Sequence, residues 1–169
     1  MRQLARMTQF IAQTPDDLPD REKTLSMSGL EFLREMLAGR ISGPPIAGLM
    51  NFWLVSVDDG RAVFRGVPKF ECLNPMGTVH GGWHGALLDS CLGCAVLTRL
   101  PRGASYTTLE YKVNITRSIP LGMEMIATGV SQHSGRSTGV ASGEIRGAQD
   151  GKLYATGSTT CIIFPPEKP

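Results

Sequence analysis

A long apolar stretch in the middle of the chain limits the possible folds more than any other feature. Residues 82–100 contain no proline, and their apolar positions surround the predicted helix instead of forming one stripe. Asn74-Pro75 and then Gly77 predict a turn before the helix, and Pro101 predicts its end. The helix would span roughly 28 Å at about 1.5 Å per residue, too short and glycine-rich to favour a membrane span. We therefore expect a buried helix that other elements cover.

Asp89 lies in the middle of this predicted helix, where a carboxylate is rare unless it is paired or functional. Its neighbours one turn away include Gly85 and Gly93, and glycine is costly in a helix interior. We interpret the glycines as leaving open space beside a reactive carboxylate. The alternative is a structural role, in which Asp89 caps a neighbouring loop.

The start of the helix carries a second feature, the sequence His80-Gly81-Gly82. Free N–H groups at a helix N-terminus favour negative charge, and glycines let a ligand approach the backbone closely. This suits a phosphate or the developing oxyanion of a carbonyl. The Gly-Lys-Ser/Thr ending of a P-loop and the Gly-x-Gly-x-x-Gly fingerprint after a strand are both missing, which excludes these two phosphate-binding motifs.

Length and charge narrow the class of protein. The 169 residues fit one domain that is large enough to bury a substantial core. A net charge of +2 is not typical of a nucleic-acid-binding protein but is compatible with an anionic small ligand. Residues 1–20 lack the apolar core of a signal peptide, so we expect a cytoplasmic protein whose four cysteines are reduced thiols.

The order of elements predicts an α+β fold. Residues 1–44 are interpreted as an N-terminal helical extension, with helices near 3–13 and from Ser28 to Leu37, and residues 165–169 as a disordered tail. Short hairpin links make the sheet antiparallel, and the buried helix requires that this sheet wrap around it. The strands are predicted at 49–57, 61–70, 105–115, 123–132, 137–146 and 152–164, with the helix after the second.

Several motifs in this order resemble one known family. They are Asn74-Pro75-x-Gly77-x-x-His80-Gly81-Gly82, Leu87-x-Asp89-x-x-x-Gly93-x-Ala95, the segment 106–114, and Gly135-Arg136 through Gly151-Lys152-Leu153-Tyr154-Ala155. Over roughly residues 45–164, the combination resembles the hotdog-fold thioesterases of the PaaI type, which are linked to phenylacetate and other aromatic catabolism. The fold implied for 45–164 is a hotdog domain, an antiparallel sheet around one central helix.

The resemblance implies that the chain hydrolyses an acyl-CoA thioester at a dimer interface, with no cofactor or metal ion. Asp89 matches the catalytic carboxylate, as a nucleophile or as the general base for water. Gly81 matches the residue whose backbone N–H polarises the thioester carbonyl. Asn74 and His80 match polar residues around the reacting group, and Thr108 matches a residue that orients the attacking water.

Three further residues are candidates for substrate binding: Gly82, Arg117 and Arg136. Gly82 allows close approach to the helix N-terminus, and arginines suit the phosphates of CoA. The chain departs from the family where Arg117 is followed by Ser118, since the family often has Arg-Pro there.

The spacing of the two central candidates predicts an oligomer. Asp89 and Gly81 are eight residues apart, about 12 Å along one helix, too far to act on one carbonyl. Two antiparallel copies of the helix would bring Asp89 of one chain near Gly81 of the other. We expect a homodimer or a dimer of dimers that binds acyl-CoA, and neither a nucleic acid nor a membrane.

Other chemistries are less favoured by the sequence. Cys91-x-x-Cys94 lacks the thioredoxin-like context of a redox pair and the four ligands of a structural zinc site. His80 and His84 are four apart but lack the accompanying Glu of a His-Glu-x-x-His zinc motif.

Two other functions remain alternatives: a hotdog enoyl-CoA hydratase and a non-catalytic acyl-CoA-binding protein. A hydratase would resemble Asn-Pro-x-His with an Asp shortly before the His, and no Asp lies between Asp59 and His80. A sensor usually carries a DNA-binding region, and residues 1–44 show no obvious pair of recognition helices. The acyl group, aromatic or medium-chain, stays open.

Overall fold

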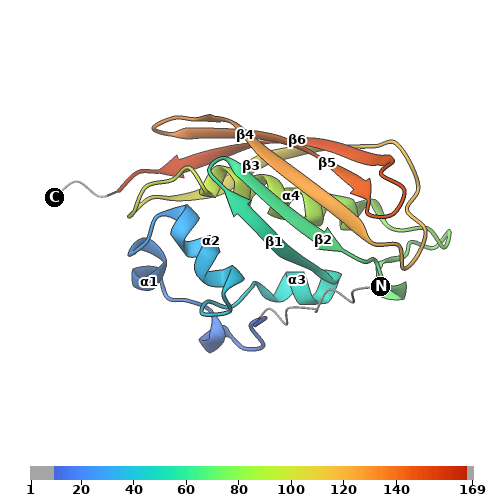
Figure 1. Cartoon of the computed structure of the whole chain (residues 1–169), viewed down its shortest axis with the longest axis horizontal. Helices are drawn as coiled ribbons and strands as arrows, with labels where there is room; N and C mark the ends of the chain where they lie inside the picture. Colours follow the sequence, from blue (N-terminus) through green and yellow to red (C-terminus); the bar gives the residue numbers. More distant parts are fainter. Residues whose placement is uncertain (1–9, 167–169) are drawn as a thin grey trace.

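One sheet wraps around one long helix in the computed structural model, which describes residues 10–166 (Figure 1). The sheet has six strands in the order β1-β2-β4-β5-β6-β3, and all its neighbouring pairs are antiparallel. Helix α4 contacts every strand, which confirms the expected hotdog arrangement. The strands are β1 (Phe52–Asp58), β2 (Arg61–Gly66), β3 (Ser105–Ile115), β4 (Met125–Ser134), β5 (Thr138–Gly147) and β6 (Leu153–Phe164).

The central helix, α4 (Gly81–Leu97), is buried as its apolar composition predicts. It ends at Leu97, about one turn before the predicted Leu100, where the Thr98 side chain forms two hydrogen bonds. The Thr98 hydroxyl donates to the Ala95 carbonyl at 2.7 Å and accepts from the Gly60 N–H at 2.8 Å. This pair of bonds caps the helix and holds it to the β1–β2 turn.

The sheet approaches α4 closely because glycines stand on the strands that face it. A Cβ atom at Gly129 of β4 would lie 2.6 Å from the carbonyl oxygen of Cys91, and one at Gly143 of β5 would lie 2.9 Å from the Leu92 side chain. Neither position has room for a larger residue. In β5 the small residues Gly139, Ala141 and Gly143 alternate with larger ones, and this alternation reflects the contact with the helix.

Edge strand β3 carries a bulge that keeps one face on the helix. Its register against β6 shifts between Thr108 and Glu110. Before the shift the even-numbered Tyr106 and Thr108 face α4, and after it the odd-numbered Tyr111 and Ile115 do so. A bulge inserts one extra residue into the strand, so the residues that face the helix change from even to odd numbers.

The N-terminal helices lie together on the side of α4 that is next to β1 (Figure 1). The predicted helix from Ser28 to Leu37 is confirmed, with a reciprocal capping box between Ser28 and Glu31. Leu33 is buried in the same core as the residues of α4. These helices are α1 (Arg21–Leu25), α2 (Gly29–Leu37) and α3 (Pro45–Met50), with a 3-10 turn at Pro15–Asp17.

The first two predicted strands are longer than the strands that the structure shows. The strand predicted from residue 49 begins at Phe52, because Pro45 starts helix α3 and Asn51, with a left-handed φ of 55°, ends it. The strand predicted to reach residue 70 ends at Gly66, and a 3-10 turn follows at Phe70–Cys72.

The helix predicted near residues 3–13 is wrong where the structure describes it. Ile11 forms a parallel bridge with Gly43, and the Ala12 N–H donates to the Gly43 carbonyl at 3.0 Å. Residues 3–9 of that prediction, and 167–169 of the predicted tail, lie outside the described residues. Within residues 10–166, each helix is too short or too polar to cross a membrane.

Candidate active site

One face of α4 runs along β3 in regular steps. The helix positions on this face are four residues apart and include three glycines and one carboxylate. Four residues are slightly more than one helical turn, so these positions form a single stripe. The pairs that the structure brings together are Gly81 with Ile115, Gly85 with Tyr111, Asp89 with Thr108, and Gly93 with Tyr106.

The Asp89 carboxylate is half-buried and accepts a hydrogen bond from the Thr108 hydroxyl at 3.0 Å. It borders a cavity of about 350 Å³ that lies between α4, β3 and the N-terminal helices. Of the described residues that line this cavity, Asp89 alone carries a formal charge. Two candidates that are 19 positions apart in the sequence therefore meet at one apolar cavity.

The other titratable groups beside Asp89 stay neutral. Burial raises the pKa of the Cys94 thiol to about 12, and the charge of Asp89 adds to this effect. Burial also raises the pKa of the Tyr106 hydroxyl well above its ordinary value, with further contributions from Cys94, Cys161 and Asp89. At neutral pH a thiol and a phenol, both protonated, therefore flank the carboxylate.

The N-terminus of α4 presents one unused backbone donor. The His80 side chain caps the helix: its Nδ1 atom accepts from the Gly82 N–H at 2.8 Å. The exposed Gly81 N–H makes no hydrogen bond to another of the described residues. Gly82, expected to bind substrate, thus has its N–H occupied, and Gly81 is the donor that a ligand could reach.

Asn74 organises the loop that leads into α4. Its Oδ1 atom accepts from the Met76 N–H at 2.9 Å and the Thr78 N–H at 3.2 Å, while its Nδ2 donates to the Thr78 hydroxyl at 2.8 Å. This is the Asx-turn geometry that Asn-Pro-x-Gly favours. In the single chain the Asn74 side chain is therefore engaged within its own loop.

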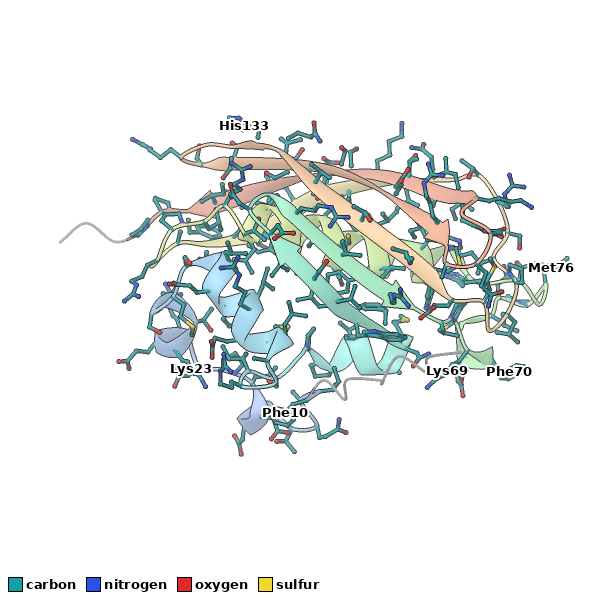
Figure 2. All side chains as sticks on the ribbon, viewed as in Figure 1. Phe10, Lys23, Lys69, Phe70, Met76 and His133 are labelled. Carbon is teal, nitrogen blue, oxygen red and sulfur yellow. The ribbon has the colours of Figure 1, made fainter. Side chains whose placement is uncertain are left out.

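The two candidate arginines lie at opposite ends of the sheet. Arg117 donates to the Leu153 carbonyl at 3.4 Å and its guanidinium carbon lies 5.9 Å from the Tyr154 ring centre. Arg136 follows β4 at the turn that His133 marks in Figure 2, far from the loop that Met76 marks. Arg117 lies beside Leu153, and the turn that holds Arg136 lies beside Ile162, the partner of Thr138. These two positions of β6 are nine residues apart, about 30 Å, so one CoA phosphate cannot contact both arginines in one chain.

Asp89 and Gly81 also stay apart within one chain, as the helix rise predicts. They are eight residues apart on the same continuous helix, about 12 Å along its axis.

Cys91 and Cys94 are free thiols, and burial raises the pKa of Cys91 too. Among residues 10–166 no three His, Cys, Asp or Glu side chains are grouped closely enough to share a metal ion.

Sequence reasoning missed the residues that close the cavity. Phe32, Leu33 and Met36 of α2 line it, as do Cys94 and Tyr106. Leu33 and Met36 were recognisable as one apolar face at helical spacing, but that pattern indicates burial without naming the surface that is covered.

Comparisons with known proteins show the family of this chain. The thioesterase superfamily matches residues 76–154. A phenylacetic acid degradation-related protein from Ralstonia eutropha JMP134 is 32% identical with a TM-score of 0.70, over 78% of this chain and 98% of that chain. The smu.793 protein of Streptococcus mutans UA159, solved with acetyl-CoA bound, is 26% identical with a TM-score of 0.63, over 70% of this chain and 92% of that chain.

Acyl-coenzyme A thioesterase 13 of Homo sapiens is 27% identical over 107 residues, which are 63% of this chain and 76% of the human protein. The superfamily match includes the end of the loop before α4, the helix itself and strands β3, β4 and β5. The chain belongs to the thioesterase superfamily, and it is a thioester hydrolase of the PaaI-type hotdog group.

Proposed function

We propose that this protein hydrolyses acyl-CoA thioesters and that Asp89 is its catalytic carboxylate. The observation that carries the proposal is the position of Asp89, held by Thr108 at the border of an apolar cavity. The acyl-CoA thioesterase name of the human relative and the acetyl-CoA bound to the streptococcal protein support CoA esters as substrates.

The chemistry needs an ionised carboxylate beside the thioester carbonyl. As a general base, Asp89 takes a proton from water while the water oxygen bonds to the carbonyl carbon. The tetrahedral oxyanion then collapses, the carbon–sulfur bond breaks, and the CoA thiolate leaves and is protonated. As a nucleophile, an oxygen of Asp89 would instead bond to the carbonyl carbon and expel the CoA thiolate, which leaves an anhydride that water cleaves. Thr108 orients the carboxylate in both routes.

The oxyanion donor in this proposal is Gly81 of a second copy. Strand β3 is a sheet edge whose only partner among the described strands is β6. It exposes Leu109 by 63%, Tyr111 by 48% and Ile115 by 49%. An exposed apolar edge favours pairing with another chain. Two β3 edges paired antiparallel would set the α4 helices side by side in opposite directions, and the proposal is a symmetric dimer or a dimer of such dimers.

The test is release of free thiol from a panel of aliphatic and aromatic acyl-CoAs. Asp89→Asn keeps the shape of the side chain but removes its basicity, so we expect kcat to fall by about 100- to 10,000-fold. Acyl-CoA binding should remain. Asp58→Asn, which changes an exposed aspartate at the end of β1, is the matched control and should keep full activity.

Two outcomes would refute the proposal. Turnover at the wild-type rate in folded Asp89→Asn would mean that the carboxylate is structural. Binding of acyl-CoAs by the wild type without any thiol release would indicate a non-catalytic acyl-CoA-binding protein.

A further inference from the structure

The cavity beside Asp89 is lined in large part by residues that precede the matched superfamily region. Residues 76–154 match the superfamily, whereas Phe32, Leu33 and Met36 of α2 line the cavity. The other lining residues that precede the matched region are Leu18, Pro19, Ser42, Pro44, Ala47, Leu54 and Phe64. The family match therefore accounts for the carboxylate but not for much of the surface that an acyl group would meet.

Helix α2 is fixed in place and not a loose cover. The Gly29 N–H donates to the Leu100 carbonyl at 3.0 Å, and a Cβ atom at Gly29 would collide with the Leu97 carbonyl. The Gly103 N–H donates to the Leu25 carbonyl at 2.9 Å. Leu97 also lines the cavity, so this tight contact holds the start of α2 against the cavity wall.

The lining determines the chemistry of the ligand. The Ser42 hydroxyl donates to the Asp17 carbonyl at 2.7 Å, and the Ser90 hydroxyl donates to the Ala86 carbonyl at 2.8 Å. Both hydroxyls are thus satisfied within the protein. The Tyr106 hydroxyl makes no hydrogen bond to another described residue. Among the described residues that line the cavity, Asp89 alone carries a formal charge. A second carboxylate in the ligand would find no cation here, and burying it unpaired is costly.

We propose that α2 sets the acyl specificity of this enzyme, which admits uncharged hydrocarbon acyl groups and is limited in their size by Met36 and Leu33. The inference rests on the proposed acyl-CoA hydrolysis and adds the substrate class and the residues that select it. On α4, Asp89 and Leu97 are eight residues apart, so the acyl group has about 12 Å of helix to lie along.

The experiment measures kcat/KM for saturated straight-chain acyl-CoAs of increasing length, with succinyl-CoA as the charged comparison. Within the cavity each added methylene should raise kcat/KM by about fourfold, the equivalent of about 0.8 kcal/mol, until the chain reaches the wall. Succinyl-CoA should be a much poorer substrate than butyryl-CoA, which has the same number of carbons.

Substitutions at Met36 should move the length limit in opposite directions. Met36→Ala enlarges the cavity and should shift the optimum to longer chains, whereas Met36→Phe should shift it to shorter ones. Leu37→Ala is the matched control, because Leu37 is half-buried on the same helix but does not line the cavity. Its profile should match the wild type. Met36→Val replaces a Met36→Ala variant that fails to fold, and because valine is also smaller than methionine it should shift the optimum to longer chains, by less than alanine would.

The outcomes separate the two proposals. Folded, active Met36 variants whose length profile equals that of the wild type would overturn the role of α2 and leave acyl-CoA hydrolysis standing. A uniform loss at all lengths would also overturn it, since a purely structural helix would act that way. Wild-type protein that hydrolyses no acyl-CoA in the panel would refute the proposed function itself, and the α2 inference with it.

Discussion

The two faces of α4 contrast more sharply than any two separate elements of the molecule. Toward β4, β5 and β6 the helix presents large apolar side chains, and the strands present glycines such as Gly143, whose missing side chain makes room for Leu92. Toward β3 the pattern is reversed: the helix presents glycines, and the strand presents large residues such as Tyr106 and Tyr111.

With Asp89 in its proposed role, the difference places stability and chemistry on separate faces of one helix. The face toward the central strands is densely packed, and Leu88, Cys91 and Leu92 have no solvent exposure. Dense packing leaves no space for a substrate. The β3 face carries the half-buried Asp89 beside a cavity. Changes on the first face should therefore cost stability, and changes on the second should cost activity.

The strongest test of the packed face is Leu92→Ala. Truncating a fully buried leucine should lower the free energy of unfolding by about 2 to 5 kcal/mol, because it loses apolar burial and leaves a cavity. Urea denaturation measures the loss. The kcat of the molecules that remain folded should be close to that of the wild type. A variant of normal stability and low kcat would break the proposed division between the faces.

The strongest test of the face toward β3 compares Gly81→Pro with Gly81→Ala at the start of the helix. Proline removes the free N–H, and loss of one oxyanion donor costs about 100- to 1,000-fold in kcat. Proline is well tolerated at the first position of a helix, so the variant should fold. A Cβ at Gly81 would meet the Ile115 side chain at an ordinary 3.5 Å, so alanine should be accommodated.

The expected order of kcat is wild type, then alanine, then proline. Circular dichroism and sedimentation check that both variants remain folded and keep the assembly of the wild type. Normal thioester hydrolysis by folded Gly81→Pro would exclude this N–H as the oxyanion donor. Full activity in a sedimenting monomer would refute the proposal that the donor comes from a second copy.

A smaller effect is expected for Thr108→Val, which keeps the shape but removes the hydroxyl. A hydrogen bond to a charged group contributes about 1.5 to 3 kcal/mol, so kcat should fall by roughly 10- to 150-fold. Thr107→Val, at the neighbouring exposed position on β3, is the control. Equal losses in both variants would indicate a general effect on the strand and not the bond to Asp89.

The smallest effect concerns His84, a polar residue one turn before Leu88. It is 1% exposed, and its Nε2 atom has no hydrogen-bond partner among the described residues. Burial lowers its pKa below the ordinary 6.5, against a smaller opposing effect of the His80 carbonyl. The imidazole in the unfolded chain therefore binds a proton more readily than His84 in the folded protein does. The free energy of unfolding has its full value above about pH 6.5 and declines as the pH falls below it.

Thermal unfolding across pH 5 to 7.5 tests this sign. His84→Gln should reduce the loss of stability on acidification, whereas His133→Gln, at an exposed position near the end of β4, should leave it as in the wild type. A wild-type protein that gains stability as the pH falls from about 6.5 would contradict a buried neutral imidazole.

Local patterns in the sequence predicted the main elements because each has a local physical cause. An apolar stretch without proline predicts a buried helix, and Ser28 with Glu31 predicts the start of α2. The segment near residue 49 was mispredicted as strand, since its apolar residues suit either a short helix or a strand and Pro45 decided between them.

The sequence by itself determined the buried helix, its single internal carboxylate and the 12 Å that separates Asp89 from Gly81, since all three follow from composition and helix rise. Only the tertiary structure decided that Thr108 donates to Asp89, because the β3 bulge fixes which side chains face α4. It also decided that α2 closes the cavity. Contacts between distant segments depend on register and packing, and neither is encoded in the spacing of residues along one element.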